Sequence, residues 1–316
     1  MSMSFEEQPT IGYAIDDPQM LFGEVEIYIA PPFDAGYIIQ IIRQLQNHGY
    51  NVYLANPSAI KQYEGLKHTD DKWDSFWLAH MYRLNILPQG YIYPKEHRPV
   101  RDLLRRRLLF VKQRTSHILS LQSMITRNLG FKMSNNDIKK LKVNDAEGLF
   151  DSSNLAFMAK NSIAAIEFLK KIIKDIEKQV KSQVKLRKEF VLLQTIPGIG
   201  NILALTIMLE VGNINRFAKV GNYSSYCRCV NSQRLSDGKK KGENNKKNGN
   251  KYLAWAYVEA ANFAVRHNAK AQRFYQRKKA KANRIVAIKA LGNKISRASY
   301  YILRDQVPFD GNMLFG

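Results

Sequence analysis

The chain has 316 residues, 45% of them hydrophobic and 11% aromatic, so it can build real cores and most of it is not disordered. Its 49 Lys and Arg residues outnumber 27 Asp and Glu residues, which gives a formal net charge of +22. Such an excess favours a polyanionic partner, nucleic acid ahead of a membrane surface. The longest apolar run, residues 202–211, is too short to span a bilayer, and the acidic start lacks a secretory signal. We therefore expect a cytoplasmic protein with no membrane partner.

The first region alternates strand and helix signals. Residues 25–30 and 50–55 have the composition of β-strands, and residues 36–49 between them have helical periodicity. This order predicts a parallel sheet with covering helices, and the helical pattern returns at residues 73–84.

Two long helices are expected in the middle of the chain. A basic helix over residues 100–129 carries Arg105 and Arg106, which either face phosphate or belong to a solvated polar face. Apolar residues from Ile163 to Val184 recur at intervals of three and four and form a narrow seam. The seam fits an intramolecular hairpin or a dimeric coiled coil equally well.

Residues 192–209 have the form of a helix-hairpin-helix. In such an element Gly198 and Gly200 would let backbone N–H groups at a helix N-terminus approach DNA phosphate. The alternative is a tight helix-helix turn, entered through Pro197, that serves packing alone.

Asp70, Asp71 and Asp74 form an acidic group in a basic protein. On a helix, Asp71 and Asp74 would lie on one face and could share a Mg²⁺ ion. The alternative is helix capping, in which the acids stabilise the first turn.

A lysine- and glycine-rich stretch follows Ser236 and could wrap a phosphate backbone, or could be a solvated loop. Its DNA-binding candidates are Lys239, Lys240, Lys241, Lys246 and Lys247. The two cysteines, Cys227 and Cys229, are too few for a zinc site, and we interpret them as reduced structural thiols.

Four segments occur in the order found in a known family. They read "GYNVYLANPSAIKQYEGLKHTDDKWDSFWLAHMYRLNILPQGYIYP", "RPVRDLLRRR", "IPGIG" and "LSDGKKKGENNKKNGNKYL". The chain resembles the DEDD transposases of insertion-sequence family one-hundred-and-ten, which include Piv-like pilin-inverting recombinases, over roughly residues 45–310. The resemblance implies an α/β plus mainly α protein. A RuvC-like (RNase H-type) domain would occupy residues 1–95, a coiled-coil connector residues 96–190, and a helical transposase domain with a helix-hairpin-helix residues 191–316.

The resemblance also implies an activity and its residues. Asp71 and Asp74 match the third and fourth metal-binding acids, with Asp70 as an adjacent extra acid, for Mg²⁺ or Mn²⁺. Ser236 matches the nucleophilic serine of a DNA transposase or site-specific recombinase. The implied partners are double-stranded DNA, a guide (bridge) RNA and further copies of the chain in a dimer or tetramer. The implied location is the nucleoid of a prokaryotic cell.

The amino end departs from the family pattern. Pro32 or Phe33 stands where the second acid is expected, and Asp34 is a possible substitute. Asp16 and Asp17 lie only about 15 residues before the end of the strand at residues 25–30, where the second acid is expected. This interval is too short for the usual strands of such a sheet. We therefore expect an incomplete RuvC-like domain. Two alternatives stay open: an inactive remnant that only binds nucleic acid, and a structure-specific nuclease that cuts branched DNA with metal-activated water.

Overall fold

The computed structural model describes most of the chain and divides it into two compact units, residues 1–92 and residues 93–316. The described residues are 25–28, 42, 44–56, 60, 71–184, 187–230, 233–236, 239–243 and 248–315. Backbone alone is described at 25–28, 71–75, 233–236, 240 and 243. Asp16, Asp17, Pro32, Phe33, Asp34 and Asp70 lie outside the described residues. The predicted connector and C-terminal region fall in one unit, so the structure draws no boundary near residue 190.

The first unit contains the strand–helix–strand pattern expected from the sequence. Strand β1 (Val25–Tyr28) pairs in parallel with β2 (Asn51–Leu54), and residues 44–47 between them are helical. Helix α3 (Asp71–Arg83) follows, and its apolar residues pack in a small buried cluster with Ala55, which comes directly after β2. That cluster contains Ala55, Leu78, Met81 and Leu87. The predicted parallel pairing is confirmed.

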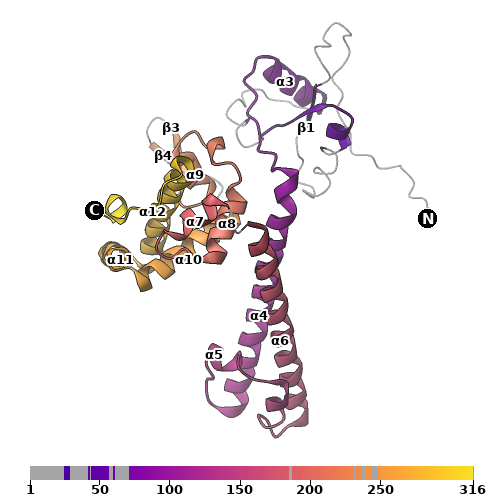
Figure 1. Cartoon of the computed structure of the whole chain (residues 1–316), viewed down its shortest axis with the longest axis vertical. Coiled ribbons are helices and arrows are strands. Elements are labelled where there is room, and N and C mark those ends of the chain that lie inside the picture. The colour runs from indigo at the N-terminus through magenta and orange to yellow at the C-terminus, as the bar shows by residue number, and fades with distance from the viewer. Residues whose placement is uncertain are drawn as a thin grey trace, which may run out of the picture. The chain divides into compact units, whose positions relative to one another are not determined.

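A long helical hairpin begins the second unit. After the short turn η3 (Lys95–His97), helices α4 (Arg98–Leu129) and α6 (Ser153–Val184) lie side by side (Figure 1). The apolar seam of α6 packs against buried residues of α4, which include Ile118, Leu121 and Ile125. The chain reverses at Gly130, whose left-handed φ of 74° ends α4, and continues through α5 (Asn135–Ile138) and η4 (Val143–Ala146). Of the two possibilities for the seam, the structure shows the intramolecular hairpin.

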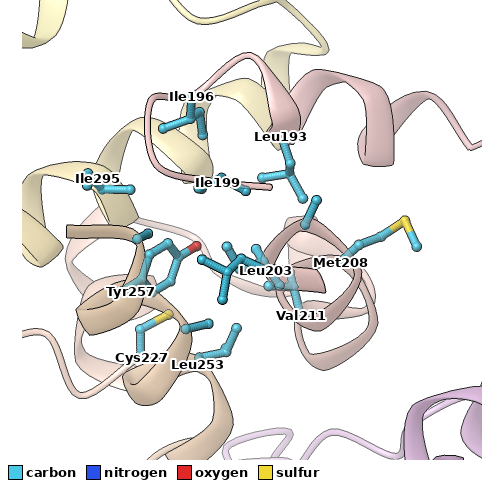
Figure 2. Close-up of a cluster of buried hydrophobic side chains, with 14 of the residues drawn as sticks. Leu193, Ile196, Ile199, Leu203, Met208, Val211, Cys227, Leu253, Tyr257 and Ile295 are labelled. Atoms are coloured by element: carbon cyan, nitrogen blue, oxygen red, sulfur yellow. The ribbon is translucent and has the colours of Figure 1, made fainter. Parts of the chain in front are cut away.

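The rest of the second unit is a bundle of helices around one core. These helices are α7 (Lys188–Gln194), α8 (Asn201–Val211), η5 (Ile214–Arg216), α9 (Val220–Tyr226), α10 (Lys251–His267), α11 (Ala269–Lys281), α12 (Arg284–Asp305) and α13 (Gly311–Phe315). Helix α8 is apolar on all sides and is buried from Leu203 onward. Figure 2 shows its Leu203 and Val211 in the same cluster as Leu253 and Tyr257 of α10. A helix that is apolar all round must lie inside a bundle, which explains its central place.

One element differs from the prediction. The lysine-rich stretch is not a loop throughout, because Lys239–Glu243 forms strand β4, which pairs antiparallel with β3 (Gln233–Ser236). The described chain is mainly α, with strands only in these two short pairs. Within the described residues, no helix combines the length and apolarity needed to cross a membrane.

Candidate functional site

Ser236 is the last residue of strand β3 and pairs with Lys239, the first residue of β4. The ladder is irregular between Arg234 and Leu235, two residues before the serine. Lys239 and Lys241 are exposed. The side chains of Ser236 and Lys240, and all of Lys246 and Lys247, lie outside what the structure describes. The predicted nucleophile therefore sits at the end of a lysine-bearing hairpin.

The segment that leads into α10, residues 248–250, is fixed to the end of α9. The Arg228 guanidinium donates to the carbonyl oxygens of Asn248 at 3.1 Å and Gly249 at 2.8 Å. The Asn250 N–H donates to the Tyr226 carbonyl at 2.7 Å. Gly249 has a φ of 89°, and a Cβ there would lie 2.5 Å from the Tyr226 oxygen, so only glycine fits this close approach. The entry to α10 is therefore held in place by α9 and Arg228.

Asn250 connects that segment to a buried ion pair. Its Oδ1 accepts from the N–H groups of Tyr252 and Leu253 and so caps α10, while its Nδ2 donates to Glu210 Oε2 at 2.7 Å. Glu210, which is 4% exposed, also accepts two hydrogen bonds from Arg105, at 2.6 Å from Nε and 2.7 Å from Nη2. This bidentate pair joins α4 to α8.

The ion pair gives Arg105 a structural role that the sequence did not show. Burial by itself lowers the pKa of Arg105, but the bonds to Glu210 outweigh it and raise the pKa above its ordinary value. Glu210 holds Nε and Nη2 of the guanidinium, and phosphate contact by Arg105 stays a prediction. Its neighbour Arg106 is exposed, and phosphate contact by Arg106 stays a prediction.

The turn between α7 and α8 shows why one of its glycines is needed. Gly198 has a φ of 89°, and a Cβ there would lie 2.2 Å from the Ala260 carbonyl oxygen of α10. Ile196 and Ile199 on either side are buried in the core (Figure 2). The packing alternative therefore accounts for Gly198. Gly200 is exposed, has a φ of −90° and no atom within 4 Å of a Cβ position, so it stays a candidate for phosphate contact.

Asp71 and Asp74 both lie in the first turn of α3, so their three-residue spacing is helical as predicted. Their side chains are not among those described. In the side chains that the structure does describe, no three His, Cys, Asp or Glu residues are grouped to hold a metal ion. Any metal role therefore depends on the backbone placement and on the chemistry of the two carboxylates.

A cationic surface on α11 and α12 was missed by the sequence interpretation. Residues 260–304 contain no Asp or Glu. Five exposed basic side chains of α11 and α12 form no ion pair with any described residue. They are Arg273 near the start of α11, Lys278, Lys279 and Lys281 at its end, and Arg284 at the start of α12. We call these five residues the α11–α12 cationic surface. The missing acids are the signal that could have revealed it.

Helix stabilisation explains only part of this surface. Cations in the last turn of α11 interact favourably with its dipole, but Arg284 is the first residue of α12, where a positive charge is unfavourable. The first turns of α10, α11 and α12 contain no acid that could offset such charge. A charge pattern that opposes local stability indicates a role outside the protein.

The two cysteines are free thiols placed in the core rather than at a reactive surface. Burial raises the pKa of Cys227 well above its usual value and that of Cys229 to about 12. Thiolate is the reactive form, so both thiols are unreactive near neutral pH. This agrees with their interpretation as reduced structural residues.

Comparison with known proteins concerns the region that contains the β3–β4 hairpin and the start of α10. Residues 191–276 match the transposase family described as IS116/IS110/IS902. The predicted family resemblance is confirmed. The matched region of this chain begins in α7, includes the β3–β4 hairpin and α10, and ends within α11.

A curated relative agrees with this assignment. The chain is 26% identical over 179 residues to a protein of Coxiella burnetii named transposase for insertion sequence element IS1111A. The similarity covers 54% of this chain and 48% of that protein. The chain thus spans about half the length of the curated relative that it matches.

Proposed function

We propose that this chain is the DNA transposase of an insertion sequence and that Ser236 is its nucleophile. The observation that carries the proposal is the position of Ser236, which ends strand β3 inside the family-matched region and pairs there with Lys239. A residue held in a strand pair has a defined backbone position, which suits a site that must place one oxygen atom accurately.

The proposed reaction is a phosphoryl transfer in two steps. Ser236 Oγ attacks a scissile phosphodiester, an Oγ–P bond forms, and the P–O bond to one deoxyribose oxygen breaks. The serine loses its proton and the leaving oxygen gains one. Attack by a hydroxyl of another DNA end on the phosphoserine reverses these changes and joins the strands. Lys239 and Lys241, both exposed near the serine, would offset negative charge on the phosphate.

Asp71 and Asp74 are the proposed ligands of a Mg²⁺ or Mn²⁺ ion. Two carboxylates in one helical turn offer oxygen ligands of the kind that these ions prefer, and the parallel strands before α3 agree with a RuvC-like unit. When bound, the ion would stabilise charge on the transferring phosphate. The two carboxylates repel each other, and a cation bound between them would offset this repulsion.

The nucleic-acid partner is proposed to be duplex DNA, bound through its backbone. The α11–α12 cationic surface supplies unpaired charge, and the exposed N-terminus of α8 at Gly200 supplies a second, helix-hairpin-helix type of contact. A guide RNA that pairs with donor and target DNA, assembly as a dimer or tetramer, and a place in the nucleoid belong to the same proposal.

The test is recombination of a supercoiled plasmid that carries the element's junction, in the presence of Mg²⁺. Ser236→Ala should lower the rate by on the order of 10⁴-fold or more and abolish the covalent protein–DNA adduct. Ser225→Ala, which alters an exposed serine of α9 in the same unit, should leave both unchanged.

The alternatives give different results in the same assay. Recombination by Ser236→Ala at the intact rate would refute the serine role. Metal-dependent cutting of a four-way junction that survives Ser236→Ala would indicate a nuclease. Salt-sensitive binding without any product would indicate an inactive remnant.

A further inference from the structure

A cavity of about 500 Å³ opens between α4 and α10 within the second unit, and its volume lies in the range of small-ligand sites. Lys251 and Tyr252, the first two residues of α10, belong to its lining and follow Asn250 directly. Its lining consists of Asp102, Arg105, Arg106, Leu108, Leu109, Lys112, Lys251, Tyr252 and Trp255.

The lining combines an apolar wall with a basic rim. Leu108, Leu109 and Trp255 form the apolar part of the lining. Arg106, Lys112 and Lys251 are exposed and form no ion pair among the described residues. The acid in the lining, Asp102, is already near Arg101 at 3.4 Å. The cavity is therefore complementary to a ligand that is flat and apolar at one part and anionic at another.

The two aromatic residues of the lining differ in their availability. The ring of Tyr252 is covered by the Arg105 guanidinium, whose Cζ lies 4.6 Å from the ring centroid. Arg105 is itself held by Glu210, so this stack is part of the protein's own packing. Trp255, one turn further along α10, is half-buried and has no ring or cation contact within the described part of the chain. Part of the indole packs against the core, and the part that lines the cavity is available for stacking.

Lys251 supports a ligand-binding interpretation over a structural one. It is the first residue of α10, where the helix dipole disfavours a cation. Its Nζ lies 5.3 Å from the Tyr252 ring centroid, so the charge is kept at the mouth of the cavity.

We propose that this cavity binds an unpaired nucleotide of a single strand, with the base stacked on Trp255 and the flanking phosphates contacted by Arg106, Lys112 and Lys251. Stacking is insensitive to base identity and needs a base that is not paired. The proposal rests on the proposed function in that strand exchange opens a duplex and exposes such nucleotides. It does not require Ser236 chemistry.

The experiment uses the fluorescence of Trp255 in the full chain. Because the chain has three tryptophans, Trp73→Phe with Trp77→Phe leaves Trp255 as the single reporter. Titration with a twelve-nucleotide oligothymidylate should quench the emission, whereas a duplex of equal length should bind without comparable quenching. Loss of one stacked base should cost about tenfold in affinity, so Trp255→Ala should weaken single-strand binding by about that factor. Because the Trp255 variants lack the reporter, their affinities are measured by the fluorescence anisotropy of a dye-labelled oligothymidylate.

Matched variants separate stacking from general effects on α10. Trp255→Phe should retain most of the affinity because it keeps a ring. Phe263→Ala, which removes a 40% exposed ring elsewhere on α10, should bind as the intact chain does. Unquenched emission at saturating oligothymidylate, or equal affinity for Trp255→Ala and Phe263→Ala, would overturn the proposal.

Two further arms identify the strand and separate this proposal from the transposase proposal. If the quenching titration gives a higher affinity for oligouridylate than for oligothymidylate, RNA is the source of the nucleotide. A higher affinity for oligothymidylate would identify DNA. Ser236→Ala should quench as the intact chain does. If plasmid recombination fails for every variant while quenching persists, the nucleotide site stands and the proposed function falls.

Discussion

The α4–α6 hairpin and the α11–α12 pair are both rich in basic residues, but they use their charge differently. On α4, the Arg98 guanidinium donates to the Tyr93 carbonyl, Arg105 is held by Glu210, and Arg107 reaches Glu177 of α6 at 2.6 Å. On the α11–α12 cationic surface, the basic side chains are exposed and no acid occurs nearby in the sequence. The number of basic residues therefore does not distinguish the two regions, whereas the absence of neighbouring acids does, and this absence favours the α11–α12 pair as the binding surface.

The largest expected effect comes from removing the charge of the α11–α12 cationic surface. Changing the five residues of the α11–α12 cationic surface to Gln should lower duplex affinity by on the order of 10³-fold at 0.1 M salt. The slope of log affinity against log salt should fall by about 4, since each lost phosphate contact removes about 0.9. Fluorescence anisotropy with a labelled duplex over a salt series measures both quantities.

The matched control removes the same charge from the other hairpin. The exposed lysines of α6, namely Lys170, Lys171, Lys174, Lys178 and Lys181, are changed to Gln together. This variant should keep most of the salt slope because these lysines alternate with acids along α6. Equal losses in the two variants would show that only net charge matters and that the cationic surface is not a specific contact.

A second change tests whether an α4 arginine serves the protein's interior. Arg105→Ala should lower the free energy of unfolding by about 3 kcal/mol, because it leaves the Glu210 carboxylate buried without its charged partner. Arg106→Ala, at the exposed neighbouring position, should stay within about 0.5 kcal/mol. Urea unfolding followed by circular dichroism provides the measurement. Unchanged stability with weaker duplex binding for Arg105→Ala would support the phosphate-facing interpretation.

The smallest expected effect tests whether Gly198 and Gly200 serve packing inside the protein or contact with phosphate. Gly198→Ala should cost about 2 kcal/mol, since it combines a left-handed φ with a collision against the Ala260 carbonyl. Gly200→Ala should leave stability within about 0.5 kcal/mol but weaken duplex binding if phosphate approaches that backbone. Thermal unfolding and anisotropy, measured on both variants, separate packing from contact. Equal duplex binding by Gly200→Ala and the intact chain would remove Gly200 from the site.

Local pattern predicted much of the fold. The strands at 25–28 and 51–54 and the helices α3, α4 and α6 follow from hydrophobic periodicity in short windows. The pattern could not choose between a hairpin and a dimeric coiled coil, because the same seam serves either partner. Strand β4 was missed because "KKKGE" lacks β-branched and aromatic residues, and it exists through pairing with β3.

Two predicted site residues have structural partners that are distant in the sequence. Arg105 is held by Glu210, which is 105 residues away, and Gly198 is required by the backbone of α10 at Ala260. No window of sequence contains both members of either pair. The resemblance to known transposases, by contrast, depended on the order of short motifs, which a single sequence displays fully.

The fixed segment at Gly249 and Asn250 ties the length of the chain to the start of α10. One residue inserted between Gly249 and Lys251 would separate the Tyr226 contact from the helix cap and from Glu210. The same asparagine therefore sets both where α10 begins and how the carboxylate of α8 is partnered, so a change in length at this point would disturb two helices at once.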